Sequence, residues 1–433
     1  MTRAGLTRRV VGLAMTAAVV STLLLAAAPR PAHAAASLDR NLVPSSGALL
    51  GAYVDPDARW TNNTDAQNEV RAFESSLGRR LDVNQHYYSW TNTFPSGLEQ
   101  WDVQNGRIPL VTWEAWGTTL RQIDSGMYDS TIRARARGLR NLGAPVFMRW
   151  GHEMNGNWYP WSGAANNDAG THNGPAKYVA AYRHIHDIFE AEGATNVVWV
   201  WSPNHESIPN ESWNHWSAYY PGDAYVDWIG PDGYNFGESK SWSSWRSFRS
   251  VFQEIYDYYA GRKPIMIAET ASVESGGYKY RWIASMWTQV SVNMPAIKAL
   301  VYFHVGGDWR TNSSASAHRK FVDMANAPHF LRVADADAPR VAGLGADSGD
   351  VVRVTYESSE PAQVTVEVRS SSGRLVRTLR GAQWTSPVLR EQRWHGRTGS
   401  GRLAPEGRYR FDIHAIDPAG HATTASQWVE LAR

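Results

Sequence analysis

Two glutamates in this 433-residue chain follow apolar, strand-like segments and could work together in catalysis. Glu153 comes shortly after residues 146–150, next to His152, and precedes a loop that contains Trp158. Glu269 ends another such segment. Aromatic and partly desolvated surroundings raise the pKa of a carboxyl group, as a general acid working near neutral pH requires. The pattern predicts acid-base chemistry by Glu153, with Glu269 as its partner.

A lone glutamate at position 153 would more simply cap a helix or pair with Arg149, so the second carboxylate carries the argument. By strand count, Glu153 follows the fourth strand and Glu269 the seventh, on opposite sides of the mouth of an eight-stranded barrel. Carboxyl groups roughly 5 Å apart cleave a glycosidic bond with retention through a covalent intermediate, whereas about 6.5–9.5 Å gives inversion. The residues alone leave both outcomes open.

Several other chemistries are excluded by composition and spacing. The chain has no cysteine, so disulfides, thiol nucleophiles and cysteine metal sites are ruled out. His152-Glu153 resembles the start of a zinc-protease helix, but that motif needs a second histidine at position 156, which is Gly156. A catalytic serine is disfavoured because the chain lacks a G-x-S-x-G turn. We therefore expect no catalytic metal and no cofactor.

Short apolar segments alternate with longer amphipathic ones from about residue 49 to residue 327. This alternation is typical of a parallel sheet covered on both faces, and eight units in under 300 residues favour an α/β fold of the (β/α)₈ (TIM) barrel type. The expected strands are 49–54, 81–87, 108–113, 146–150, 197–201, 226–230, 265–268 and 299–303, and the expected helices 66–77, 131–142, 176–191, 245–260 and 280–290.

Polar and aromatic residues follow many of these strands, and in a barrel they converge at one mouth. They are residues 86–88, 113–116, 152–153, 201–204, 232–235, 269–270 and 304. Of the 21 tryptophans, 18 lie between Trp60 and Trp309. Trp199, Trp228 and Trp287 are expected in the core, whereas the clusters 113/116, 158/161 and 213/216 suit the flat apolar faces of sugar rings. Trp113 is therefore a candidate substrate contact.

The composition changes after Phe330. Residues 333–340 are rich in Ala, Asp and Pro and are predicted to form a linker. Alternating segments at 351–354, 363–369, 375–379 and 408–413, separated by Gly and Ser turns, predict a small all-β sandwich over residues 341–433.

The first 34 residues have the pattern of a secretory signal. Basic residues up to Arg9 are followed by the uncharged stretch 10–28 and by Ala32-His33-Ala34, a typical cleavage site. An uncleaved membrane anchor is the alternative, because the stretch approaches the ~20 residues that span a bilayer. Thr7-Arg8-Arg9 leaves the general and twin-arginine export routes open. We expect a secreted, extracellular protein whose catalytic domain covers residues 35–332.

The charge balance indicates no partner recruited by charge. Without the signal the chain has 39 Lys and Arg against 41 Asp and Glu. Such a balance offers no electrostatic footprint for nucleic acid or, after signal cleavage, for an anionic membrane. We expect a monomer whose partner is a polysaccharide substrate.

Residues from about 49 to 330 resemble glycoside hydrolase family 26, whose known members include β-mannanases that are retaining (β/α)₈ enzymes. The resemblance rests on Arg149, on the run His152-Glu153-Met154-Asn155-Gly156, on Asp232 and Tyr234, on Glu269, and on Trp309-Arg310. It implies that Glu153 is the acid/base and Glu269 the nucleophile, and that Tyr234 positions the nucleophile. It also implies substrate contacts by His152, Trp158, Asp232, Trp309 and Arg310.

The resemblance makes β-1,4-mannan the expected substrate of an endo-acting enzyme, although two segments depart from the mannanase pattern. Residues 149–153 read Arg-Trp-Gly-His-Glu where many mannanases have Arg-Pro-Phe-His-Glu, and Trp113-Glu114-Ala115-Trp116 is more similar to members acting on mixed-linkage β-glucan. A mixed-linkage glucanase or a β-xylanase of the same family is therefore the alternative. A polysaccharide-binding protein without turnover and a transglycosylase remain further hypotheses.

The tail resembles the immunoglobulin-like domain of flagellar hook-capping proteins, a module also appended to secreted bacterial enzymes. The resemblance rests on residues 394–401, 405–409 and 417–420. Their glycines and prolines are turn residues and carry no functional signal. A spacer or weak attachment module is the expected role.

Overall fold

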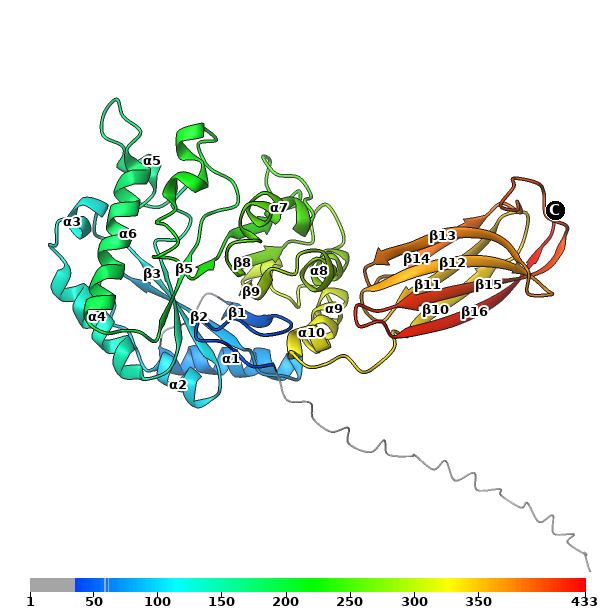
Figure 1. The fold of residues 1–433 in the computed structure, drawn as a ribbon, viewed down its shortest axis with the longest axis horizontal. Helices are drawn as coiled ribbons and strands as arrows, with labels where there is room; N and C mark the ends of the chain where they lie inside the picture. The colour runs from blue at the N-terminus through cyan, green and yellow to red at the C-terminus, as the bar shows by residue number, and fades with distance from the viewer. Residues whose placement is uncertain (1–35, 58–59, 61) are drawn as a thin grey trace, which may run out of the picture. The chain divides into compact units, whose positions relative to one another are not determined.

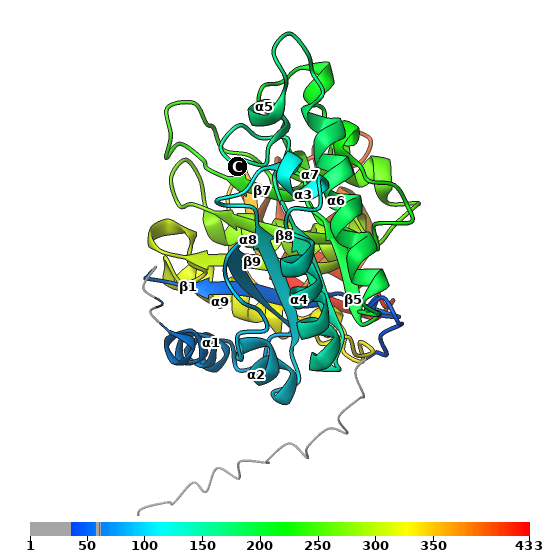
Figure 2. The same cartoon turned by 90° about the vertical axis from the view of Figure 1, so that its left-hand side faces the viewer.

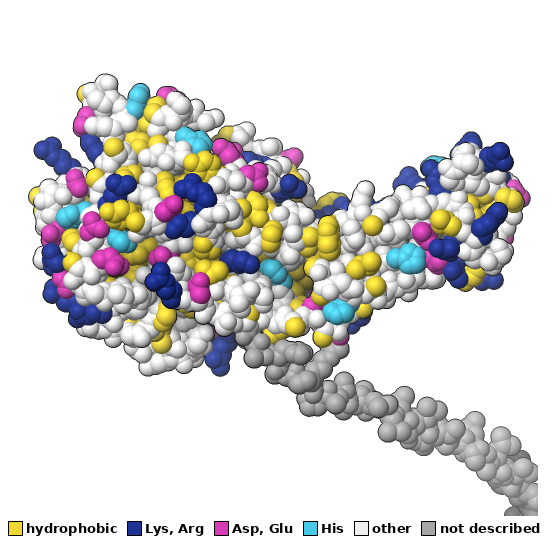
Figure 3. Space-filling model, in the orientation of Figure 1, with side chains coloured by type: hydrophobic (Ala, Val, Ile, Leu, Met, Phe, Trp, Pro, Cys, Tyr) yellow, Lys and Arg dark blue, Asp and Glu magenta, His cyan; other side chains and the backbone are white. Residues whose placement is uncertain are grey.

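The computed structural model describes residues 36–57, 60 and 62–433. The predicted signal segment, residues 1–34, lies outside the described residues. No helix of the described part is both long enough and apolar enough to cross a membrane. On the face shown in Figure 3, acidic and basic side chains are interspersed.

Nine parallel strands close into a barrel, in the order β6-β5-β4-β3-β2-β1-β9-β8-β7, with β6 also pairing with β8. The predicted (β/α)₈ fold is confirmed, because the predicted sixth strand is present as two short pieces, β6 and β7. Pro231, which lacks an amide N–H, lies between these two pieces. The strands are β1 (Leu49–Asp55), β2 (Val83–Ser89), β3 (Ile108–Glu114), β4 (Val146–Trp150), β5 (Val197–Trp201), β6 (Trp228–Ile229), β7 (Asp232–Asn235), β8 (Ile265–Ser272) and β9 (Ile297–Val305).

Helices pack outside the strands (Figures 1 and 2). Helix α7 (Phe248–Tyr259) shows why: Phe248, Val251, Phe252, Ile255 and Tyr259 are buried at helical spacing, and the Ser247 hydroxyl caps its first turn. The other helices are α1 (Asn63–Leu77), α2 (Leu98–Gln104), α3 (Leu120–Asp124), α4 (Asp129–Leu142), α5 (Gly163–Asn166), α6 (Gly174–Ala191), α8 (Lys279–Thr288), α9 (Ala315–Ala325) and α10 (Pro328–Leu331).

Strand alternation divides the barrel core into two layers. Val83, Leu110 and Phe147 belong to a cluster inside the barrel, whereas Val111 and Trp113 pack in the layer between strands and helices. The same alternation sorts the residues near the strand ends. It decides which of them can reach the mouth.

The tail, drawn in orange and red in Figure 1, consists of two antiparallel sheets, in agreement with the predicted all-β architecture. One sheet has the order β10-β11-β14 and the other β13-β12-β15-β16. The strands are β10 (Val341–Asp347), β11 (Val352–Ser358), β12 (Ala362–Ser370), β13 (Leu375–Thr385), β14 (Arg390–Trp394), β15 (Gly407–Ile416) and β16 (Ala422–Leu431). The sequence did not predict β10, β14 and β16, because few of their side chains are buried and the alternation is weak.

A buried ion cluster joins Arg107, the residue before β3, to α1 and α2. Arg107 donates from Nε and Nη2 to Glu74, at 2.7 and 2.6 Å, and its Nη1 lies 3.6 Å from Asp102. Its guanidinium carbon also lies 4.3 Å from the ring centre of Trp101. Removing one partner of such a cluster leaves charges buried and unpaired, which is more costly than losing a surface ion pair.

We therefore predict that Arg107→Ala lowers the free energy of unfolding by about 3–5 kcal/mol. The measurement is urea unfolding followed by tryptophan fluorescence, which reports mainly the barrel because 18 of the 21 tryptophans lie there. Arg71→Ala is the matched control, because Arg71 contacts the same Trp101 ring but is exposed. It should cost about 0.5 kcal/mol or less, and equal losses in the two variants would contradict the prediction.

Candidate functional site

Glu269 lies at the barrel mouth because the pairing of β8 with β9 shifts register between Ile267 and Thr270. An irregularity of this kind re-aims a side chain that strict alternation would point outward. Tyr87 on β2 donates a hydrogen bond to Oε1 of Glu269, and Tyr234 on β7 donates to Oε2. With Arg149, these donors fix the position of the carboxylate.

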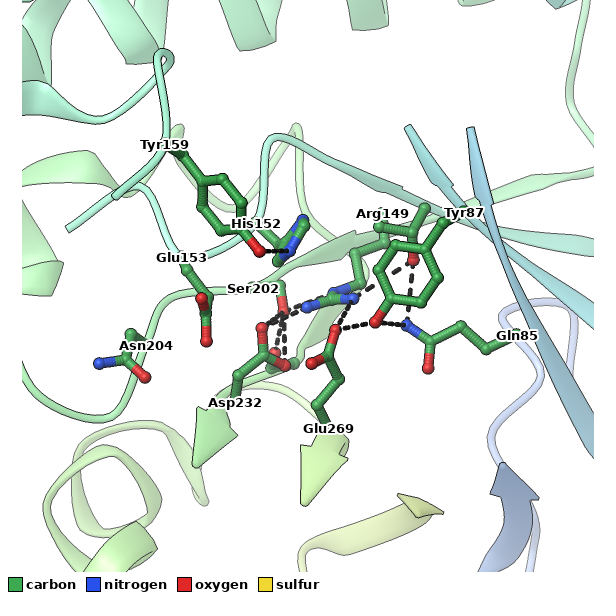
Figure 4. A network of polar contacts seen from close by, with 12 residues as sticks. Gln85, Tyr87, Arg149, His152, Glu153, Tyr159, Ser202, Asn204, Asp232 and Glu269 are labelled. Carbon is green, nitrogen blue, oxygen red and sulfur yellow. Dashed lines mark hydrogen bonds and ion pairs between the residues drawn. The ribbon is translucent and has the colours of Figure 1, made fainter. Parts of the chain in front are cut away.

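Arg149 of β4 lies between the carboxylates of Glu269 and Asp232, as Figure 4 shows. Its side chain is fully buried, and its Nη1 donates to Glu269 Oε1 at 2.6 Å. Its Nη2 forms an ion pair with Asp232, and its Nε donates to Ser202 Oγ at 2.8 Å. A buried guanidinium is stable only with partners of this kind, so the three charged groups hold one another in place.

Glu153 lies beyond the end of β4 in a left-handed backbone conformation, with φ +52°. For a residue other than glycine this conformation is strained, and it persists because the surroundings hold it. The Glu153 amide donates to Ser202 O at 2.7 Å, and Trp158 Nε1 donates to Glu153 Oε2 at 2.7 Å. Gly156 lets the Trp158 ring pack closely, since a Cβ there would lie 2.5 Å from that ring.

Burial and the nearby charge of Glu269 raise the pKa of Glu153 to about 7, against weaker opposing contributions from the Trp158 hydrogen bond and from Arg149. Near neutral pH this group can therefore release a proton and take one up. Burial and the charge of Arg149 lower the pKa of His152 well below its usual value, so this imidazole is neutral. Its Nε2 lies 3.1 Å from the hydroxyl of Tyr159.

A cleft of about 950 Å³ contains both glutamates. A cleft of this size with a few convergent polar groups is the usual form of a ligand site. It is lined by Glu153, Asn157, Trp158, Tyr159, Asn204, His205, Glu206, Ile208, Tyr234, Phe236, Trp242, Ser243, Ser244, Arg246, Glu269 and Phe303.

The structure brings most of the predicted residues together. Glu153, Trp158, Tyr234 and Glu269 line the cleft. His152 and Asp232 are buried and lie outside its lining, so direct substrate contact by these two residues stays a prediction. The short helical turn Gly307–Trp309 carries Trp309, whose ring centre lies 5.3 Å from that of Tyr234.

Trp309 and Arg310 lie outside the residues that line the cleft. Arg310 donates from Nε to Gly307 O at 3.4 Å. Lys279 holds the loop that carries both residues. Its Nζ donates to the carbonyl oxygens of Asp308 and of Arg310, the latter at 2.6 Å. Direct substrate contact by this loop stays a prediction.

The predicted substrate contact by Trp113 is wrong. Its side chain is fully buried and stacks on Trp90, with ring centres 4.3 Å apart. Leu110 and Thr112 share the inner face of β3, so alternation points Trp113 to the helix layer. A side chain without exposed surface cannot offer a face to a sugar. His86 also leaves the mouth for the same reason and lies 2.5 Å from Asp102 of α2.

Tyr87 and Ser202 lie in segments predicted to reach the mouth, but their contacts around Glu269 were not predicted, and Gln85 was not named. Gln85 Nε2 donates to the Tyr87 hydroxyl and to Thr112 Oγ1, both at 3.1 Å, and thereby orients Tyr87. Ser202 links Arg149 to Asp232. Strand alternation could have identified Gln85 and Tyr87 from the sequence, because they share the inward face of β2 with Val83.

Within the described ranges, one group of side chains could hold a metal ion: Asp335, Asp417 and His421, whose ligand atoms lie within 4.8 Å of one another. Asp417 already accepts hydrogen bonds from His421, from its amide at 2.9 Å and from its ring at 3.1 Å. None of the three lines the cleft.

The site lies in a part of the chain that is similar to known proteins. Residues 121–275 match the family model described as Glycosyl hydrolase family 26, a segment that contains both glutamates. The chain is 33% identical over 338 residues to Endoglucanase H of Acetivibrio thermocellus, which covers 73% of this chain and 36% of that protein. The chain therefore spans about a third of the length of this relative.

Two further similarities involve Bacillus subtilis proteins. A mannan endo-1,4-beta-mannosidase from this organism is 34% identical over 106 residues, or 24% of this chain and 27% of that protein. The solved structure of the mannanase BCman is 20% identical, with a TM-score of 0.48, and the match covers 65% of this chain and 86% of that one.

We predict that Glu269→Gln lowers the pKa of Glu153 from about 7, because the charge that repels its ionised form is removed while burial remains. Carbon-13 NMR of protein labelled at the glutamate carboxyl carbons would measure it, with Glu153→Gln to assign the signal. The exposed Glu254 lies outside the cleft lining, so Glu254→Gln is the control and should leave the titration unchanged. An unshifted titration in Glu269→Gln would show that the two carboxyl groups do not interact.

We also predict that Trp113→Ala lowers the free energy of unfolding by about 3–5 kcal/mol, as expected for a large buried aromatic side chain. Trp158→Ala should cost far less, because that side chain is 41% exposed. Urea unfolding of both variants gives the comparison. Similar losses would mean that Trp113 is not the core residue described above.

Proposed function

Since the barrel belongs to glycosyl hydrolase family 26, we propose that the protein is a secreted, monomeric endo-β-glycanase that hydrolyses β-1,4-mannan with retention of configuration. One observation carries the proposal: two carboxyl groups of one cleft have different surroundings. Glu269 accepts hydrogen bonds from Arg149, Tyr87 and Tyr234, which fix its position. Burial keeps Glu153 available as a proton donor near neutral pH.

In the first step, Glu269 attacks the anomeric carbon and forms a bond to it, while the bond from that carbon to the leaving oxygen breaks. Glu153 transfers its proton to that oxygen, so the leaving chain departs as a neutral alcohol. The Trp158 hydrogen bond to Glu153 Oε2 limits the orientations of the acid. The product is a glycosyl ester of Glu269 together with ionised Glu153.

The second step follows from the coupling between the two groups. Once Glu269 is esterified, its charge is gone, and the repulsion that raised the pKa of Glu153 disappears. Glu153 can then stay ionised and accept a proton from water, whose oxygen attacks the anomeric carbon. The ester bond breaks, Glu269 regains its charge, and Glu153 is protonated again. Two inversions at one carbon give net retention.

Mixed-linkage β-glucan is the second candidate substrate. The relative that aligns over 73% of the chain is named an endoglucanase, whereas the mannosidase of Bacillus subtilis aligns over 24%. Both polymers contain β-linked pyranose units with apolar faces, so the two-carboxylate chemistry would be the same for each. The choice between them lies in contacts to the hydroxyl groups of the sugar.

The test is release of reducing ends from galactomannan, glucomannan, barley β-glucan, β-1,3-xylan and carboxymethylcellulose. We expect turnover of the mannans, internal cleavage as judged by product size, and the β anomer as the first product by proton NMR. Glu269→Ala should abolish turnover, and Glu153→Gln should lower it by about 10²–10⁴-fold.

Each outcome of this test decides between hypotheses. Turnover of barley β-glucan alone would assign the second candidate, and the α anomer first would overturn retention. Binding without any turnover would favour a polysaccharide-binding protein. Elongated products at high oligosaccharide concentration would identify a transglycosylase. Full activity of Glu269→Ala would remove Glu269 as the nucleophile.

A further inference from the structure

Trp242 is the most exposed large apolar side chain among the described residues, with 71% of its surface accessible. It follows β7 in a turn that lines the catalytic cleft, together with Ser243 and Ser244. Single exposed apolar residues are common on protein surfaces, so exposure alone says little. Here the exposed indole stands at the edge of the cleft that contains both glutamates, so a ligand in the cleft can contact it.

Aromatic rings connect Trp242 to the nucleophile. The ring centre of Trp242 lies 5.0 Å from that of Phe236, and Phe236 lies 5.9 Å from Tyr234, whose hydroxyl donates to Glu269. Phe236 is also held edge-on by Trp309, at 5.1 Å. The row therefore runs from the reacting carboxylate to the edge of the cleft, and Phe236 supports the inner side of Trp242.

The placement of the acid assigns this row to the leaving-group side. Glu153 must reach the glycosidic oxygen, which joins the attacked sugar to the leaving chain. The cleft extends from Glu153 over the loops that follow β4, β5 and β7, through Trp158, Asn204 and Trp242. A leaving chain that starts at Glu153 and follows this cleft can reach the exposed Trp242.

We propose that Trp242, backed by Phe236, is a sugar-binding platform for a pyranose unit of the leaving chain beyond the unit next to the cleaved bond. The inference rests on the proposed function and deepens it. The apolar face of a β-linked glucose or mannose unit packs on the indole. Ser243, Ser244 and Glu206, which line the same end of the cleft, offer hydrogen-bonding groups to its hydroxyls.

Two consequences follow for the substrate. The enzyme gains binding energy from a leaving chain of at least two sugars, which favours cleavage inside a polymer over removal of a terminal unit. A small aryl leaving group never reaches Trp242. Loss of the indole should therefore lower the rate on long substrates and leave the rate on short ones unchanged.

The experiment compares Trp242→Ala with the unchanged protein on the polymer it hydrolyses best, on the matching oligosaccharides, and on an aryl β-glycoside of the same sugar. We expect kcat/KM to fall about ten-fold on polymer and long oligosaccharides, which corresponds to one lost aromatic contact. We expect no change on the aryl glycoside. In Trp242→Ala, the cleavage pattern of oligosaccharides should shift toward shorter leaving chains. Trp242→Phe should restore most of the rate.

Tyr278→Ala is the matched control, because Tyr278 is also exposed, at 61%, but does not line the cleft. It should leave both substrates unaffected. Binding of the oligosaccharides to Glu269→Ala, with and without Trp242→Ala, gives a second readout by calorimetry that needs no turnover.

The two proposals fail in different ways. If the unchanged protein cleaves none of the glycans, the proposed function fails. If it cleaves them and Trp242→Ala keeps the same kcat/KM, product pattern and oligosaccharide affinity, the platform is absent and the function stands. An equal loss on polymer and aryl glycoside would also overturn the platform, because it would indicate a disturbed catalytic centre.

Discussion

The buried guanidinium of Arg149 is the constraint on which the rest of the site depends. Its charge lies in the barrel interior without contact to solvent, so it needs anions beside it, and Glu269 and Asp232 supply them from β8 and β7. Because Arg149 belongs to β4, this one side chain ties together strands from opposite sides of the barrel. Glu269 is thereby fixed in position by the same contacts that hold the mouth of the barrel together.

The surroundings of Glu153 differ from those of Glu269. It follows the same strand as Arg149, but the backbone turns through Gly151 and a left-handed Glu153, and the carboxyl group points into the cleft beneath Trp158. Desolvation and repulsion from Glu269 then favour its neutral form. The barrel thus gives two chemically identical groups different surroundings.

The abundance of tryptophan has two physical explanations. Many of the indoles, such as Trp113 and Trp150, fill the layer between strands and helices and stabilise the barrel. Others, including Trp158 and Trp242, keep exposed surface in the cleft. Composition alone cannot separate the two groups, because neighbouring positions in a strand point to opposite sides. Trp113 and Thr112 differ in role for this reason alone.

The sequence by itself determined the barrel and the all-β tail and identified Glu153 and Glu269 as the candidate catalytic pair, since hydrophobic periodicity and the residues around these two glutamates are local properties of the chain. It also pointed to Tyr234 and Trp158. Only the tertiary structure decided that Tyr87, oriented by Gln85, holds Glu269, that Trp113 is a core residue, and that Trp242 stands at the cleft. Those outcomes depend on a register shift in β8, on the alternation of β2 and β3, and on a loop after β7. Contacts between residues far apart in sequence set the register shift and the position of the loop, and they decide which face of β2 and of β3 points into the barrel.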